Sequence, residues 1–118
     1  MKFSAVLLGL CGVAAALSAL AAPPGKQTAQ EVAGAALFRA QDCAHCHGEA
    51  LEGAKKGPAL AELWKDKAWT PEKIMAQILN GGQKMPPFGD SLTDEQIAQL
   101  VAYLRARKKP SMPPVGQP

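Results

Sequence analysis

The sequence predicts a small all-α domain. Residues 29–40, 71–80 and 93–109 space their apolar side chains as one face of a helix requires. No segment shows a convincing two-residue alternation of apolar and polar side chains, which would be typical of a strand. The chain also lacks an internal repeat. We therefore expect about three to five helices around one core.

The first 21 residues have the features of an export signal. Lys2 precedes an apolar stretch from Phe3 to Leu20, and Ala19-Leu20-Ala21 has the small-x-small form of a signal peptidase site. The stretch is alanine-rich and interrupted by glycine and serine, which favours cleavage over retention as a membrane anchor. We expect cleavage after this site, which removes Cys11, and a periplasmic protein without stable membrane insertion.

The remaining chain of about 97 residues is within the size of one domain. Residues 22–28 are predicted to be a flexible lead-in, 29–109 the domain, and 110–118 a disordered, proline-rich tail. The formal net charge of +3 falls to +2 when Lys2 is removed, so a nucleic-acid partner has no electrostatic support. We expect a monomer.

A first helix is predicted from about Ala29 to Ala40. The residues expected on its buried side are Val32, Ala36 and Leu37. Gly34 and Phe38 are four residues apart on one face, where the glycine would allow another helix to approach closely.

A glycine- and lysine-rich stretch follows, from residue 48 to 67, and is predicted to be an ordered loop with one helical turn around residues 60–64. Thr70 then begins the next helix as its N-cap, with Pro71 at the first helical position. Its apolar side contains Ile74, Met75, Ile78 and Leu79, with Trp69 placed to pack against the first of these. Asn80-Gly81-Gly82 ends it.

The last helix has the strongest local signals. Thr93 and Gln96 form a capping box, with Leu92 and Ile97 placed to pack around it. Apolar residues recur at helical spacing through Leu104. Four basic residues are expected at the favourable C-terminal end of this helix, which Pro110 stops: Arg105, Arg107, Lys108 and Lys109.

Residues 43–47, with the sequence CAHCH, form a CxxCH motif typical of covalent haem attachment. Two thiols three positions apart on a helical turn lie on the same face and can each reach one vinyl group of a porphyrin. We therefore expect Cys43 and Cys46 to bind one haem c covalently, and His47 to supply an axial nitrogen to its iron.

Three other interpretations of the motif are weaker. A zinc site would need a second Cys/His pair, which the chain lacks. A thioredoxin-like redox pair would need strands around it. A structural disulfide would leave His47 and the methionine loop described next without a role. His45 is expected to be a surface residue, because its neighbour holds the ligating position.

The second axial ligand is predicted to be Met85. It follows Gly81-Gly82, which allows close approach of the backbone, and precedes Pro86-Pro87, which stiffens it. A thioether is a soft, neutral ligand suited to iron that changes charge. Met75 is better explained as core of the preceding helix and Met112 as a tail residue, and Met85 could also simply fill space in the core.

The chain resembles a small class I bacterial cytochrome c over residues 29–109. The resemblance rests on the haem motif, on Gly57-Pro58-Ala59-Leu60, and on Asn80-Gly81 before the Met85-Pro86 loop. It implies an all-α cytochrome c-like fold wrapped around one haem, with the carbonyl of Pro58 orienting His47. It also implies that Gly34 and Phe38 pack against Leu100 and Tyr103 of the last helix.

With His47 and Met85 both bound, the iron has no open position, which indicates an electron carrier rather than an enzyme. Its expected partners are redox proteins: a dehydrogenase or respiratory complex as donor and an acceptor such as a terminal oxidase. The alternative is a five-coordinate haem sensor or a catalytic haem domain with a labile Met85. Docking through Lys55, Lys56 and Lys84 is expected near the haem edge, although these lysines could equally serve only to solvate the surface.

Overall fold

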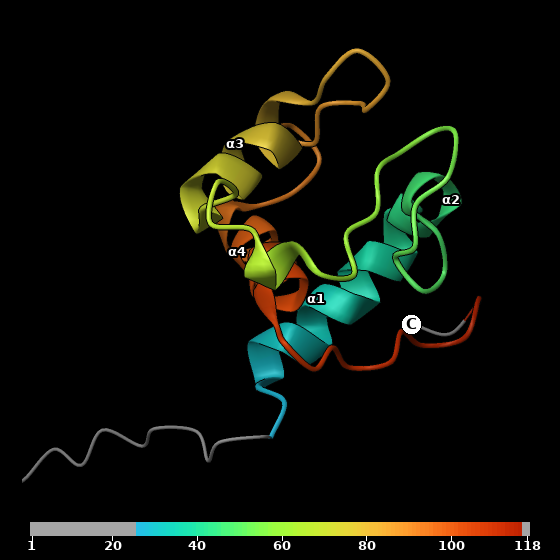
Figure 1. Ribbon diagram of the computed structural model, residues 1–118, viewed down its shortest axis with the longest axis vertical. Helices are drawn as coiled ribbons and strands as arrows, with labels where there is room; N and C mark the ends of the chain where they lie inside the picture. Colours follow the sequence, from blue (N-terminus) through green and yellow to red (C-terminus); the bar gives the residue numbers. More distant parts are fainter. Residues whose placement is uncertain (1–25, 117–118) are drawn as a thin grey trace, which may run out of the picture.

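The computed structural model describes residues 26–116, and within that range it contains four α-helices, one short 3-10 helix and no strand (Figure 1). The helices are α1 (Ala29–Ala40), α2 (Cys43–His47), η1 (Leu63–Lys65), α3 (Pro71–Asn80) and α4 (Asp94–Arg105). A single isolated bridge joins Ala54 and Gly57. The all-α prediction is therefore confirmed. The predicted export signal, residues 1–21, lies outside the described residues.

Each of the three long helices has a side-chain cap at its N-terminus. Thr70 Oγ1 accepts from the Lys73 amide at the start of α3, and Thr93 with Gln96 forms the predicted capping box of α4. A second capping box, which the sequence analysis missed, begins α1: Thr28 Oγ1 accepts from the Glu31 amide while the Glu31 carboxylate accepts from the Thr28 amide. These local signals explain why the observed starts of the helices match the predicted ones.

The predicted end of α4 is wrong by four residues. The helix ends at Arg105, and the buried Ala106 that follows is extended, with φ −64° and ψ 134°. Lys109 Nζ donates to the carbonyls of Ala106 and Ala61, at 3.0 Å each. This basic residue therefore bonds the turn and the distant loop instead of extending the helix. The single helical turn expected around residues 60–64 is present, as η1 at Leu63–Lys65.

α1 and α4 cross in close contact, and this crossing contains the centre of the core (Figure 1). A Cβ atom added to Gly34 would overlap the carbonyl oxygen of Gln99 and lie 2.6 Å from Tyr103 Cβ. The rings of Phe38 and Tyr103 pack with their centroids 5.5 Å apart at an angle of 58°. The predicted approach of the first helix to the last is therefore observed.

The predicted buried face of α1 is partly wrong. Val32 is 51% exposed, and Ala36 and Leu37 are only partly buried, whereas the buried residues of α1 are Gly34, Ala35 and Phe38. The face of α1 is set by where α4 can approach most closely, and that is at Gly34. Small and apolar residues occur on all sides of α1. For this reason their pattern in the sequence predicted the wrong buried face.

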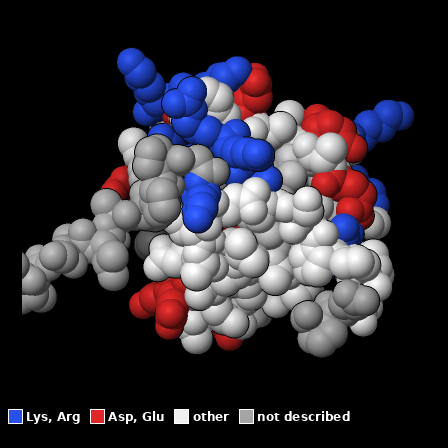
Figure 2. Space-filling view, turned by 90° about the horizontal axis from the view of Figure 1, so that it is seen from below, with Lys and Arg blue, Asp and Glu red and all other residues white. Residues whose placement is uncertain are grey.

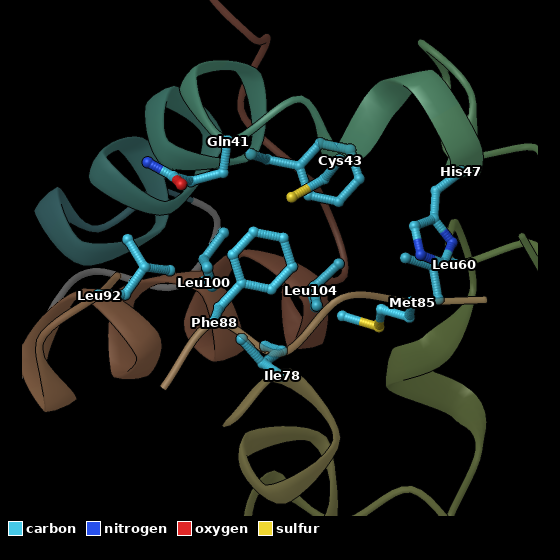
Figure 3. A pocket seen from close by; sticks show the side chains of 11 residues that line it. Gln41, Cys43, His47, Leu60, Ile78, Met85, Phe88, Leu92, Leu100 and Leu104 are labelled. Carbon is cyan, nitrogen blue, oxygen red and sulfur yellow. The ribbon is translucent and has the colours of Figure 1, made fainter. Parts of the chain in front are cut away.

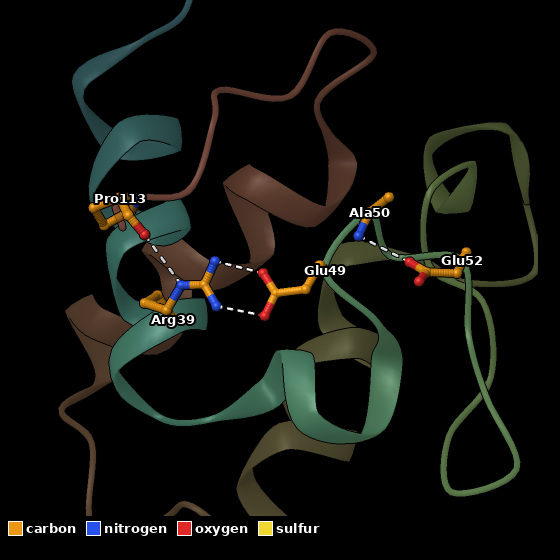
Figure 4. A network of polar contacts seen from close by, with 5 residues as sticks. All are labelled: Arg39, Glu49, Ala50, Glu52 and Pro113. Carbon is orange, nitrogen blue, oxygen red and sulfur yellow. Dashed lines mark hydrogen bonds and ion pairs between the residues drawn. The ribbon is translucent and has the colours of Figure 1, made fainter. Parts of the chain in front are cut away.

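Part of the predicted disordered tail contacts the domain. Pro110 is buried, and Met112 packs against the core. Arg39 of α1 donates through Nε to the Pro113 carbonyl at 3.1 Å and through both terminal nitrogens to the Glu49 carboxylate (Figure 4). The hydrogen bonding with Arg39 lowers the pKa of the Glu49 carboxyl group from its usual value. One guanidinium thus joins α1, the loop after α2 and the C-terminal segment.

Charged side chains are distributed unevenly on the surface. On the face shown in Figure 2, Lys and Arg side chains gather in one region beside a broad uncharged area, and Asp and Glu lie mainly at the margins. The electrostatic field over that region is therefore positive even though the net charge of the chain is only +3. None of the helices in the described part of the chain is long and apolar enough to cross a membrane.

We predict that Gly34→Ala lowers the free energy of unfolding by about 2 kcal/mol, because the added methyl group would force α1 and α4 apart. The cost of this separation exceeds the gain in helix propensity from glycine to alanine, which is about 1 kcal/mol. Chemical denaturation of the holoprotein measures the effect. Gly82→Ala is the matched control, since its Cβ would meet only the flexible Gln77 side chain, at 3.1 Å. Equal stability of the two variants would contradict the prediction.

Candidate haem site

The CxxCH motif forms its own short helix directly after α1. Only Gln41 and Asp42 separate the two helices, and Asp42 makes the turn in the left-handed conformation, at φ 59°, which aspartate tolerates better than most residues. Gly48 ends α2 with φ 89°. The position of α2 is therefore determined by α1, which is itself held against α4. Cys43 and Cys46 are free and partly buried.

The predicted site residues line one cavity of about 860 Å³. Its lining includes Cys43, Cys46, His47, Pro58 and Met85. This volume lies within the range of roughly 300–1,000 Å³ typical of cofactor pockets. The structure thus brings together side chains from α2, from the loop after it and from the loop after α3.

A smaller apolar pocket of about 40 Å³ shares several of these lining residues (Figure 3). Figure 3 shows the His47 ring, attached to α2, and the Met85 side chain, attached to the loop after α3, on the same side of this pocket. The rest of the lining is mostly hydrocarbon, including Leu60, Ile78 and Phe88. Such an environment suits the flat apolar face of a porphyrin.

His47 is oriented by a backbone carbonyl. Its Nδ1 lies 2.8 Å from the oxygen of Pro58, and because a carbonyl only accepts, Nδ1 must be the protonated nitrogen. In the neutral imidazole, Nε2 is then left with a free lone pair. Gly57 makes this approach possible, since a Cβ at that position would lie 3.1 Å from Nδ1 and 3.0 Å from the Cys46 oxygen.

Met85 is held by a tight turn after α3. The amide of Gly82 donates to the Met85 carbonyl at 2.8 Å, and Gly81 adopts φ 67°, where an added Cβ would lie 2.5 Å from the same oxygen. Phe88 returns to α3 by donating its amide to the Ile78 carbonyl at 3.0 Å. The loop is therefore closed on itself and on α3, which positions Met85 in the lining of the cavity.

Met75 lies in the core and His45 on the surface, as predicted, whereas Met112, predicted to be a tail residue, packs against the core. Met75 and Met112 pack against the core and are not part of the cavity lining. His45 is exposed at the rim of the cavity, with Nε2 2.9 Å from Lys56 Nζ. Among the methionines of the described residues, Met85 is therefore the one whose side chain lines this cavity.

The alternative interpretations of the cysteines find no support in the described residues. Burial raises the pKa of the Cys43 thiol to about 11, so at neutral pH it is a poor nucleophile for disulfide exchange. Between residues 26 and 116, no three His, Cys, Asp or Glu side chains come close enough to hold a metal ion. The donor set instead suits a group that takes two thioether bonds and two axial ligands.

Comparison with known proteins decides the family. Residues 29–104, more than half of the chain, match the family described as cytochrome C oxidase, cbb3-type, subunit III. The chain belongs to this family of c-type cytochromes. The predicted cytochrome c-like fold is thereby confirmed, and so is the expectation that the protein contains covalently bound haem c.

Relatives of two kinds are similar to this cytochrome. Cytochrome c6 of Nostoc sp. is 39% identical over 104 residues, which cover 86% of this chain and 88% of the relative. Cytochrome c6 of Leptolyngbya boryana is 41% identical over 81 residues, 64% of this chain and 91% of the relative. The cbb3-type cytochrome c oxidase subunit FixP of Sinorhizobium medicae is 38% identical over 95 residues, 69% of this chain.

The cytochrome spans only about a third of the length of that FixP subunit, against nearly nine-tenths of the Nostoc cytochrome c6. The match to the FixP subunit therefore concerns only a part of that relative. The family match and the similarity to cytochrome c6 support the expectation of an electron-transfer protein rather than an enzyme.

The sequence analysis missed part of one wall of the cavity. Leu63, Asp66 and Trp69 line it from the segment around η1. No local signal could have identified the first two, because a loop has no periodicity to show which of its side chains face inward. Only the packing of this loop against α4 brings them to the cavity.

We predict that folding depends on haem attachment, because the core is small and its helices surround a large cavity. The Cys43→Ser/Cys46→Ser double variant should show weak helicity and no cooperative melt by circular dichroism. The wild-type chain produced without haem is the matched control and should behave alike, since both lack the cofactor. A native-like, cooperative melt of either apo chain would count against coupled folding.

Proposed function

We propose that this cytochrome is a periplasmic one-electron carrier in which Cys43 and Cys46 bind the haem, and His47 and Met85 are its two axial ligands. The observation that supports this most directly is that an imidazole from α2 and a thioether from the loop after α3 line the same cavity. When bound, the haem supplies a one-electron couple. The residues of the chain determine its access and its potential.

His47 and Met85 have different contributions. The hydrogen bond from Nδ1 to the Pro58 carbonyl at 2.8 Å leaves the lone pair of Nε2 available for the iron and raises the basicity of this nitrogen. Met85 offers a neutral, soft sulfur in an apolar lining, which disfavours the more highly charged oxidised state and so raises the potential. With both positions filled, no site remains for a substrate, which favours transfer of electrons over catalysis.

The compartment and the partners follow from other features. The export signal predicted in residues 1–21 supports a periplasmic location. Similarity to a subunit of a cbb3-type cytochrome c oxidase supports a terminal oxidase as the acceptor. A dehydrogenase or another respiratory complex would then be the donor.

Lysines at the cavity suggest how such partners dock. Lys55, Lys56 and Lys84 contribute to its lining, and all three are exposed. They come from the loop after α2 and from the Met85 loop, on either side of the cavity. Weak redox encounters use small interfaces with charged rims, so this arrangement fits a brief complex with an acidic partner.

Replacing Met85 tests the ligand set. Met85→Leu should remove the ferric near-infrared band of methionine-to-iron charge transfer, make the ferrous form reactive to carbon monoxide and lower the potential, because the neutral sulfur ligand is lost. Visible and near-infrared spectra with redox titration measure this. Met75→Leu is the matched control and should leave all three unchanged.

The wild-type spectrum separates the carrier from the alternative of a five-coordinate haem sensor or catalytic haem domain. A high-spin ferric spectrum without the methionine band would overturn the proposal. So would identical spectra for Met85→Leu and the wild type.

Charge reversal tests the docking surface. The triple variant Lys55→Glu, Lys56→Glu, Lys84→Glu should be reduced at least about tenfold more slowly by a physiological partner at low salt, and the difference should shrink as salt screens the charges. Stopped-flow kinetics at several ionic strengths measures it. Reversal of Lys26, Lys67 and Lys108, which are exposed and outside the cavity lining, provides the charge-matched control. Equal rates for both triple variants would refute the surface.

A further inference from the structure

One wall of the cavity is a short irregular segment. Leu63, Asp66 and Trp69 line the cavity from it. Within residues 62–69, the backbone hydrogen bonds are local. The amides of Lys65, Asp66 and Trp69 each donate to the carbonyl three residues earlier, at 2.9, 3.1 and 3.2 Å. Such bonds shape the turn but do not attach it to the rest of the protein.

Leu63 and Trp69 pack against the core, and Arg105, the last residue of α4, adds hydrogen bonds that attach the segment to this helix. Its Nη1 lies 3.0 Å from the Leu63 oxygen, 3.2 Å from that of Trp69 and 3.3 Å from that of Asp66. The two hydrogens of this nitrogen are shared among three carbonyls that are 36 to 42 residues away in the sequence. Because the donor is charged, these bonds are stronger than ordinary ones.

The three bonded carbonyls belong to the same residues whose side chains line the cavity. The guanidinium is partly buried behind this wall and is not itself part of the lining. We infer that Arg105 is a positioning residue that holds the 63–69 wall against the haem cavity and thereby raises the reduction potential. This inference rests on the proposed function, because it requires the haem to occupy this cavity.

Two effects of Arg105 on the potential have the same sign. A closed wall excludes water, and a drier cavity disfavours the more highly charged oxidised state. The fixed positive charge of the guanidinium also disfavours that state. Loss of Arg105 should therefore lower the potential, whereas loss of a nearby cation that does not hold the wall should change it less.

The chain offers a matched control in Arg107. It is exposed, two residues further along, with its guanidinium carbon 4.9 Å from the ring centroid of Trp64. It bonds none of the three carbonyls. Arg105→Gln and Arg107→Gln thus remove the same charge from neighbouring positions, but only the first removes the hydrogen bonds to the three wall carbonyls, whereas the second loses a contact with the Trp64 ring alone. Arg105→Lys keeps the charge while losing the planar fork.

The experiment combines hydrogen exchange with redox titration of the holoproteins. In Arg105→Gln the amides of Lys65, Asp66 and Trp69 should exchange on the order of tenfold faster, because the wall opens more often when these bonds are lost. Its potential should fall below that of Arg107→Gln. Arg105→Lys should lie between Arg105→Gln and the wild type in both measurements, and it serves as the test if Arg105→Gln does not fold.

Equal exchange in Arg105→Gln and Arg107→Gln would overturn the inference, and so would faster exchange with no larger fall in potential. These outcomes differ from failure of the proposed function, which the wild-type spectrum reports through its methionine band. If that band were missing, the ligand set would be wrong, whereas the exchange rates would still show whether Arg105 holds the wall.

Discussion

The close contact between α1 and α4 is the constraint on which the rest of this cytochrome depends. Gly34 lets the two helices approach until backbone and Cβ atoms touch, and the rings of Phe38 and Tyr103 fill the crossing. α2 is joined to α1 by two residues, so this contact also determines where the haem motif lies. At the other side of the crossing, α4 provides the surface on which α3 and the cavity wall pack.

Around this crossing, loops rather than helices complete the site. The Pro58 carbonyl and the Met85 sulfur both belong to irregular segments, and each is positioned by a glycine that leaves room for the backbone: Gly57 beside His47, and Gly81 beneath the methionine turn. Cations attach further loops from the outside, as Arg39 does for the C-terminal segment. A fold with so little apolar core thus uses specific bonds to order its loops, and we expect it to depend on its cofactor as well.

Where the sequence analysis succeeded, the signals were local. Thr70 and Thr93 begin their helices because their hydroxyl groups cap the amides that follow, which needs no tertiary contact. It failed where a distant contact competes. Val32 is exposed because α4 approaches the side of Gly34. The run of basic residues after Arg105 is not helical, and its last member, Lys109, bonds the Ala61 carbonyl 48 residues away.

The residues that we propose for the site could be identified from the order of amino acids alone. The three-residue spacing of Cys43 and Cys46, the adjacent His47 and the single methionine between glycines and prolines are all properties of contiguous residues, and each limits what can be bound there. How the 63–69 segment is attached depends instead on the folded arrangement, because the carbonyls that Arg105 bonds lie 36 to 42 residues before it in the sequence. Bonds between distant segments leave no periodic trace in a sequence, since they depend on how the helices pack.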